Sequence, residues 1–166
     1  MTNTYQTSYR KDVEAKKIFV TRTFDAPLEK VWKAWTNKEI LEQWWAPKPW
    51  KAKTKSMNFA TGGSWLYAMV GPANEEHWSK AEYLSVVPLK SFHGKDCFCD
   101  KDGNPISGFP STDWKVNFIS SQNQTLVEVE LSFENEEQLN QLVKMGFEQG
   151  FAMAHDNLDE VLKTMK

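Results

Sequence analysis

Residues suited to metal binding or nucleophilic chemistry gather in one stretch of the sequence. They are His77, His93, Cys97, Cys99, Asp100 and Asp102. A Cys-x-Cys pair could bind zinc, but no second Cys or His pair follows at a spacing typical of zinc sites. The run from Asp100 resembles the start of a calcium loop, yet Pro105 and Ser111 stand where such a loop needs Gly and Glu. We therefore expect a hairpin turn here, no metal site and no resident cofactor.

Nucleophilic catalysis is the second chemistry that these residues suggest. His93 and Cys97 would share one face of a strand, but residues four apart on a strand are separated by about 13 Å, too far for a dyad. The sequence also contains no nucleophile elbow, phosphate loop or dinucleotide-binding glycine motif. We assign no catalytic residue, and we interpret Cys97 and Cys99 as unpaired thiols in a fold without disulfides.

General acid–base chemistry needs a polar side chain in an apolar environment that shifts its pKa. Three residues have the sequence context for this. Asp96 alternates with Phe92 and Phe98, Tyr67 lies between Trp65 and Met69, and His155 lies near the apolar side of the C-terminal segment. Each of the three fits a purely structural role as well.

Two short helices, one long helix and several strands are expected to position these groups. Residues 17–24 alternate like a strand, and residues 25–35 then place Leu28, Val31, Trp32 and Trp35 at helical spacing. Asp25 is the expected N-cap of this helix. Thr36 and Glu39 have the capping-box spacing for a second helix, which Pro47 and Pro49 end.

Six further strands are expected, followed by one long helix over residues 135–166 that Asn135 caps. The strands cover residues 53–59, 64–70, 77–87, 91–98, 113–120 and 125–133. The last of them alternates cleanly between apolar and polar residues, which indicates an antiparallel sheet with one wet face. The predicted class is α+β: a strongly curved antiparallel sheet of about seven strands, in the order β-α-α-β6-α, wrapped around the C-terminal helix.

The composition limits the classes of function. The chain has 166 residues, 20 basic and 22 acidic, and a net charge of −2, which favours neither nucleic acid nor an anionic membrane as partner. No apolar run approaches the roughly 20 residues of a membrane span. We expect a loose polar tail over residues 1–14, a single domain over residues 15–166, and, since the start lacks an apolar signal segment, a cytoplasmic location.

Several motifs resemble one protein family. They are "VTRTFDAPLEKVWKAWTNKEILEQWWAP" (20–47), "GGSWLYAMVGP" (62–72), "EYLSVVPLKSF" (82–92), "FCDKDGNPISGFPSTDWKV" (98–116) and "MGFEQGFAMAHDNLDEVL" (145–162). The chain resembles the helix-grip fold of the START/SRPBCC superfamily, which includes birch-pollen-allergen-like proteins. It is most similar to a bacterial single-domain subgroup of the AHSA-type branch, which is named after the activator of the heat-shock chaperone ATPase.

This resemblance implies a cavity between the sheet and the C-terminal helix. On strand parity and helical spacing, its expected lining residues are Trp35, Trp45, Trp65, Tyr67, Met69, Phe92, Asp96, Trp114, Phe118, Phe147, Gly150, Phe151 and Ala154. The expected function is non-catalytic binding of a small apolar or aromatic molecule. An enzyme of the cyclase or hydrolase type using the same cavity, and a chaperone ATPase regulator, are the alternatives.

Two further expectations concern packing. Gly146 and Gly150 could leave room for a ligand, or could let the helix approach the sheet closely. Leu66, Ala68 and Val70 form a second apolar face on their strand, which suggests cover by the N-terminal tail or by a second copy in a homodimer. Of the five tryptophans in residues 32–50, Trp50 is expected to be the most exposed.

Overall fold

The structure is a computed structural model that describes residues 6–165. Within this range the chain forms one sheet and four helices. The strands are β1 (Ser8–Asp12), β2 (Lys17–Phe24), β3 (Lys51–Met57), β4 (Ser64–Val70), β5 (Glu76–Val87), β6 (Ser91–Cys99), β7 (Thr112–Ser121) and β8 (Gln124–Phe133). The helices are α1 (Leu28–Thr36), α2 (Lys38–Trp44), α3 (Glu136–Lys144) and α4 (Phe147–Thr164).

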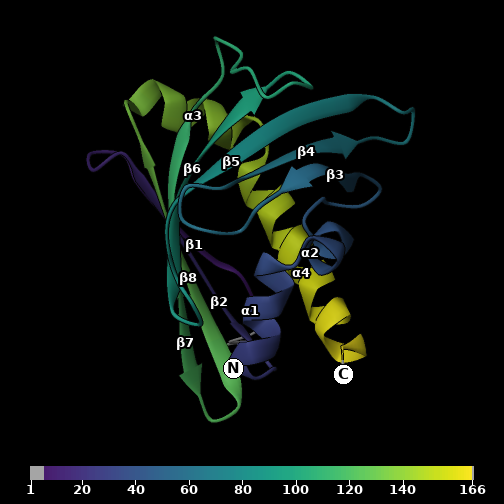
Figure 1. Cartoon of the computed structure of the whole chain (residues 1–166). Helices are drawn as coiled ribbons and strands as arrows, with labels where there is room; N and C mark the ends of the chain where they lie inside the picture. Colours follow the sequence, from purple (N-terminus) through teal and green to yellow (C-terminus); the bar gives the residue numbers. More distant parts are fainter. Residues whose placement is uncertain (1–5, 166) are drawn as a thin grey trace.

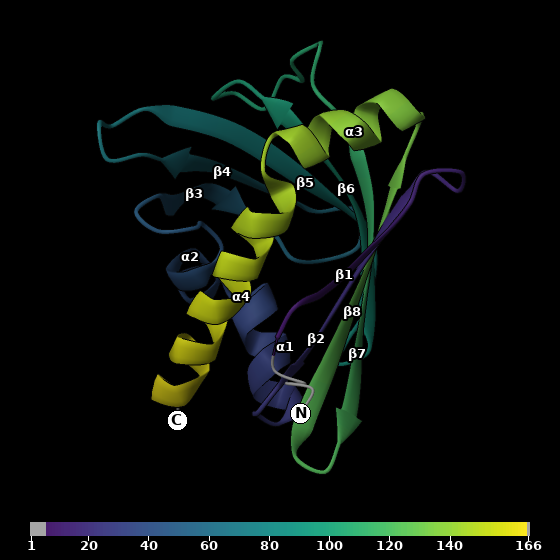
Figure 2. The same cartoon turned by 180° about the vertical axis from the view of Figure 1, so that it is seen from behind.

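The sheet is antiparallel and its strands follow the order β1-β2-β8-β7-β6-β5-β4-β3. It curves, and β3 to β6 bend across α4, while β2, β7 and β8 run alongside α1 (Figures 1 and 2). The predicted α+β helix-grip class is confirmed. The sheet has eight strands rather than about seven.

One face of the sheet forms the core, because apolar residues alternate with polar ones along the strands. In β2 every second residue is buried, and in β8 every second residue from Thr125 to Phe133 is buried. The register places Val20 opposite Val129 and Ile18 opposite Leu131, so that apolar side chains of neighbouring strands face the helices together.

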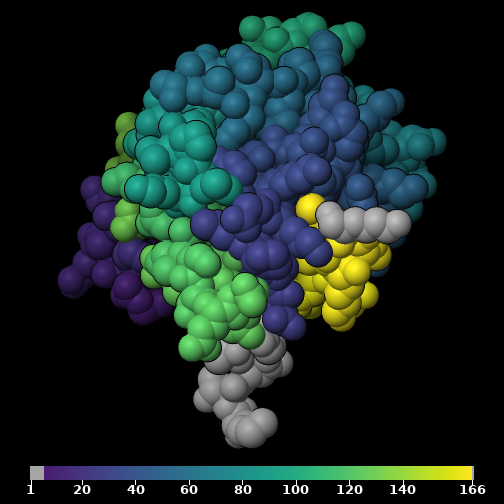
Figure 3. Space-filling view, turned by 60° about the horizontal axis from the view of Figure 1, so that its bottom comes forward, coloured from purple at the N-terminus to yellow at the C-terminus, as the bar shows by residue number. Residues whose placement is uncertain are grey.

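The two short helices close one end of the sheet. Figure 3 shows α1 from this end, between the β7–β8 hairpin and the C-terminal end of α4. Trp35 and Trp44 are buried here, and the indole N–H of Trp44 donates to the carbonyl of Ala34 at 2.9 Å. Trp50 is half-buried against His77, with ring centroids 5.4 Å apart. Trp32 and Trp45 are half-buried as well, so the expectation that Trp50 is the most exposed of the five stays a prediction.

The predicted helix caps were partly wrong. Pro27, not Asp25, is the N-cap of α1, and it makes no side-chain capping bond. Asn37, not Thr36, caps α2 by accepting from the backbone N–H of Ile40, since the Thr36 hydroxyl donates back to Trp32 within α1. The predicted cap at Asn135 is confirmed, because its side chain accepts from Gln138 N–H at 2.9 Å.

The N-terminal segment is more ordered than expected. Residues 8–12 belong to the predicted loose tail, but they form β1, which pairs with β2 from Ser8 opposite Thr21 to Asp12 opposite Lys17. The sequence signal was weak because these edge-strand residues are mostly polar and their partners are main-chain groups. Residues 1–5 of the predicted tail lie outside the described residues.

The predicted single helix over residues 135–166 is in fact two helices. Gly146 separates α3 from α4 with φ +89°, a left-handed conformation that glycine adopts without steric cost. Gly146 therefore turns the chain, and it does not serve close packing of one straight helix. No helix in residues 6–165 combines the length and apolarity needed to cross a membrane.

The second apolar face of β4 is covered by the chain itself. Leu66 and Ala68 are buried. A side chain at Gly103, in the turn after β6, would lie 3.8 Å from Leu66, and Lys80 holds this turn by donating to the Gly103 carbonyl at 3.0 Å. β1, the described strand of the N-terminal segment, lies at the far end of the sheet order from β4 and does not cover this face. Its burial needs no second copy of the chain.

Candidate functional site

An outer cavity of about 210 Å³ lies between the sheet and α4. Strands β4 to β7 form one wall, and the first two turns of α4 with Leu142 of α3 form the other. Its lining residues are Trp45, Pro47, Tyr67, Met69, His77, Ser79, Asp96, Cys97, Phe98, Pro110, Thr112, Trp114, Leu142, Phe147, Gly150 and Phe151. The walls are mostly aromatic and aliphatic, with a few polar groups, which is the usual composition of a small-molecule site.

A smaller inner cavity of about 40 Å³ continues toward α1 and α2. It is lined by Trp35, Leu41, Trp45, Trp65, Tyr67, Ala81, Tyr83, Phe92, Gly94, Lys95, Asp96 and Trp114. Four residues line both cavities: Trp45, Tyr67, Asp96 and Trp114. They stand where the two spaces meet, so a molecule in the outer cavity would contact all four.

Asp96 on β6 is the acidic residue of the shared wall. Burial raises the pKa of its carboxyl from 3.8 to about 7, although the side chain keeps some surface accessible to water through the cavity. The indole N–H of Trp114 partly opposes this rise, but Trp114 Nε1 has no well-formed hydrogen bond and remains a buried donor without a partner. Asp96 can therefore change its charge near neutral pH.

Tyr67 on β4 and Trp45 after α2 are joined across the cavity wall. The indole N–H of Trp45 donates to the phenolic oxygen of Tyr67 at 3.0 Å, and the Tyr67 ring stacks on Trp65 with centroids 3.8 Å apart. Burial, followed by the nearby Asp96 carboxyl, raises the pKa of Tyr67 well above its ordinary value. Tyr67 is thus a neutral hydroxyl that can still donate its own proton.

The helix side of the outer cavity depends on a glycine. A side chain at Gly150 would place its Cβ 3.8 Å from Pro47, an ordinary contact distance, so the absence of a side chain leaves space rather than allowing a close backbone approach. Phe147 and Phe151 flank this position on α4, with ring centroids 5.3 Å apart.

Most residues that the sequence predicted for the cavity do lie on its walls. The exceptions are Phe118 and Ala154, which are 5% and 1% exposed in the core and line neither cavity. Phe118 is covered by α1, since its ring packs against Trp32 and Trp35 with centroids 5.0 Å and 5.8 Å away. Parity gave the correct face of β7 but not how far the cavity extends along it.

Sequence reasoning missed the part of the wall that comes from loops and flanking strands. The missed residues are Pro47, His77, Ser79, Cys97, Phe98, Pro110, Thr112 and Leu142 in the outer cavity, and Leu41, Ala81, Tyr83, Gly94 and Lys95 in the inner one. Phe98 could have been found, because it shares strand parity with Asp96. Pro110 and Leu142 carry no such signal. The loop before β7 positions Pro110, and the break between α3 and α4 positions Leu142.

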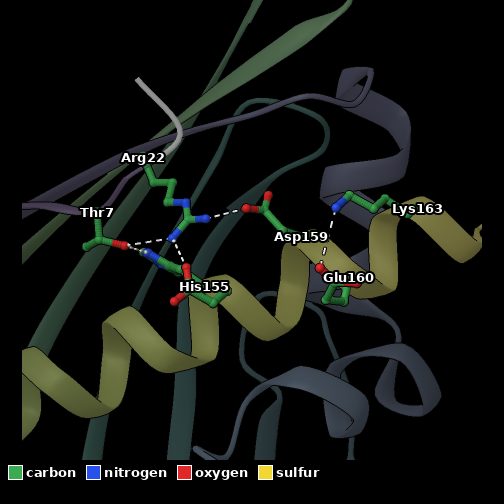
Figure 4. A network of polar contacts seen from close by, with 7 residues as sticks. Thr7, Arg22, His155, Asp159, Glu160 and Lys163 are labelled. Atoms are coloured by element: carbon green, nitrogen blue, oxygen red, sulfur yellow. Dashed lines mark hydrogen bonds and ion pairs between the residues drawn. The ribbon is translucent and has the colours of Figure 1, made fainter. Parts of the chain in front are cut away.

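His155, the third candidate for acid–base chemistry, lies outside both cavities in a polar network that ties α4 to β2 (Figure 4). Its Nδ1 is 2.8 Å from the hydroxyl oxygen of Thr7, which also accepts from Arg22 at 3.2 Å. Arg22 pairs in turn with Asp159 and Asp156. Burial, and then the Arg22 charge, lower the pKa of His155 from 6.5 to about 3, so this histidine is neutral and structural.

His77 and Cys97 line the outer cavity, whereas His93 and Cys99 line neither cavity. His93 pairs with Asp113 at 2.8 Å, and Cys97 and Cys99 are free thiols whose pKa values burial raises. Within residues 6–165, no three His, Cys, Asp or Glu side chains converge where they could hold a metal ion. Asp100 instead accepts from the backbone N–H groups of Asp102 and Asn104 in the expected turn.

The fold and site define a helix-grip domain with a partly open, largely apolar cavity between the sheet and α4. Residues 25–163 match the family described as activator of Hsp90 ATPase homolog 1-like protein, and the chain belongs to this family. None of the curated proteins matches the sequence.

Solved bacterial structures share the whole fold. A solution NMR structure of a protein from Arthrobacter aurescens is 30% identical, covers 95% of this chain and 92% of its own, and has a TM-score of 0.89. The crystal structure of protein Ms6760 from Mycobacterium smegmatis is 25% identical, with 97% and 99% coverage and a TM-score of 0.88. A solution NMR structure from Staphylococcus epidermidis is 29% identical, with 96% of each chain covered and a TM-score of 0.82.

Proposed function

We propose that this protein binds a small apolar or aromatic molecule in the outer cavity, without chemical conversion. The observation that carries the proposal is the combination of space and lining: a partly open volume of about 210 Å³ lined mainly by aromatic and aliphatic side chains, with Asp96 and Tyr67 where it meets the inner cavity. A dry apolar cavity of about 150 Å³ holds a molecule the size of benzene. The outer cavity therefore suits a ligand with one ring and a short substituent.

Tryptophan fluorescence offers a direct test, because Trp45 and Trp114 line the cavity. Titration with single-ring aromatic compounds should change the emission saturably and raise the melting temperature, since a ligand that binds only the folded state stabilises it. The variant Gly150→Leu should abolish both effects by filling the cavity. Met153→Leu is the matched control, because Met153 is 43% exposed on the same helix.

A second function, general acid–base catalysis, is favoured by one observation. Asp96 has a pKa of about 7 in an apolar cavity, which is the property that an enzyme needs in a carboxyl acid or base at neutral pH. In this case a bound ligand would be turned over, and Asp96→Asn would abolish turnover while leaving the binding of product-like compounds intact. Mass spectrometry of a compound incubated with the protein distinguishes the two functions, because a binder returns it unchanged.

A further inference from the structure

The Asp96 carboxyl has no cationic partner among residues 6–165. The ion pairs of the described residues use other carboxylates. The side chains that interact electrostatically with Asp96 include the Trp114 indole, the Tyr67 hydroxyl and the Cys97 thiol, all neutral at pH 7. A buried carboxylate without a counter-charge is costly, and proteins normally pair such a group or keep it protonated. The partner of this carboxyl can instead come from the ligand.

Aromatic rings that line the outer cavity together with Asp96 are inclined to one another. Trp114 meets Trp45 at 46°, Phe147 at 79° and Phe151 at 77°, with centroids 5.7–6.2 Å apart. Aromatic faces carry negative partial charge and attract cations, and several inclined rings form the cages that bind ammonium groups. One carboxyl among such rings provides both kinds of attraction for a positively charged nitrogen.

None of the other titratable groups on the cavity walls forms an ion pair with Asp96 among the described residues. Tyr67 on β4 and Cys97 on β6 are neutral at pH 7, because burial raises the pKa of each. Lys95 precedes Asp96 on β6 and lines the inner cavity, but its side chain is exposed and forms no ion pair with Asp96 among the described residues. His77 on β5 is exposed. The lining residues from the α2–β3 segment, α3, α4 and β7 are not ionisable.

We propose that the ligand of this cavity is an arylalkylamine, a molecule with an aromatic ring and an amine on a short alkyl chain. The ring would pack between α4 and the sheet, and the protonated nitrogen would pair with the Asp96 carboxylate. The inference rests on the proposed binding function and specifies its ligand class. Tyr67 and Trp114 would steady the carboxylate as donors, and the aromatic walls would surround the ammonium group.

This pairing makes binding depend on pH in a stated direction. A simple alkylamine stays protonated up to about pH 9, so the titration of interest is that of Asp96. Because burial raises its pKa to about 7, the carboxyl of the free protein is mostly protonated at pH 6 and mostly charged at pH 8. Affinity for an amine should therefore rise from pH 6 to pH 8, whereas affinity for a neutral analogue should stay level or fall.

The test uses two matched probes, 2-phenylethylamine and 2-phenylethanol, in calorimetric titrations of the whole chain at pH 6 and pH 8. The amine should bind the wild-type protein about tenfold more tightly than the alcohol at pH 8, as expected for a hydrogen bond to a charged group. Asp96→Asn should remove this preference and its pH dependence while still binding the alcohol, which shows that the variant is folded. Asp113→Asn, which removes a carboxylate outside both cavities, should behave as wild type.

The outcomes separate this inference from the proposed function. If the alcohol binds as well as the amine, or if Asp96→Asn keeps the preference for the amine, the ligand class is wrong while the binding function stands. Binding of the amine that is no tighter at pH 8 than at pH 6 would also overturn the inference, because the charged Asp96 carboxylate would then not be its partner. If neither probe binds the wild type, the proposed function and this inference both fail.

Discussion

The indole N–H of Trp45 donates to the phenolic oxygen of Tyr67 at 3.0 Å, and this bond links the end of α2 to the middle of β4. Both residues line the outer and the inner cavity. The bond therefore holds in place the part of the wall at which the two spaces meet. It also satisfies a half-buried indole donor that packs against Trp35, Trp44 and Trp65.

Tyr67→Phe should lower the free energy of unfolding by about 1–3 kcal/mol, because it leaves the Trp45 N–H without its partner. Urea denaturation monitored by fluorescence measures this loss. In a Trp45→Phe background the same change should lower the free energy of unfolding much less, since the indole N–H that needs the Tyr67 oxygen is then absent. An equal loss in both backgrounds would mean that the bond contributes nothing.

The two glycines of the C-terminal helices should respond oppositely to substitution by alanine. Gly146→Ala should destabilise the protein by roughly 1–2 kcal/mol, because an L-residue is strained at φ +89°. Gly150→Ala should stabilise it by up to about 1 kcal/mol, since the position is helical and the new Cβ meets only Pro47 at 3.8 Å. Thermal denaturation of the two variants gives both signs.

Gly150→Ala should also weaken the binding of single-ring ligands, because its methyl group enters the outer cavity. Binding that is unaffected by this change, in a variant that is more stable, would place the ligand elsewhere. Stability lost in both glycine variants would contradict the distinction between a turn position and a space-making position.

The sequence predicts those strands and cavity residues whose positions follow a regular alternation of apolar and polar side chains. Strand alternation predicted β2, β4 and β8 to within one residue, and parity put Asp96, Tyr67 and Trp114 on the inner face. The break at Gly146 was missed because apolar spacing continues across it, and glycine within a helix gives the same sequence signal as glycine at a turn. Pro110 and Leu142 reach the cavity only through that break and the preceding loop.

Arg22 makes two ion pairs with α4 that should differ in strength. Arg22 is 4% exposed; its partner Asp159 has a side chain that is 27% exposed, whereas Asp156 is 73% exposed. Asp159→Ala should lower the free energy of unfolding by about 1.5–3 kcal/mol, as for a hydrogen bond to a charged group shielded from water. Asp156→Ala should cost less than about 1 kcal/mol. Chemical denaturation compares them, and equal losses would contradict the role of burial.

Two buried groups should give the protein opposite dependences of stability on pH. For His155 the pKa falls from 6.5 to about 3 on folding, so below pH 6.5 the unfolded chain binds a proton that the folded chain does not. Its effect is a free energy of unfolding that declines as the pH falls from 6.5 toward 3. For Asp96 the pKa rises from 3.8 to about 7, so the folded chain holds the extra proton, and stability declines as the pH rises from 3.8 toward 7.

Between pH 4 and 6.5 these two effects oppose one another, and each amounts to at most about 1.4 kcal/mol per pH unit. Relative to the wild type, His155→Gln should therefore lose stability as the pH rises through this range, and Asp96→Asn should gain it. Urea denaturation at pH 4.5, 5.5 and 6.5 measures the slopes, which a general loss of packing would not change. Asp113→Asn is the control for removing a carboxylate outside the cavity. Slopes identical to the wild type in both variants would show that neither group titrates as its burial requires.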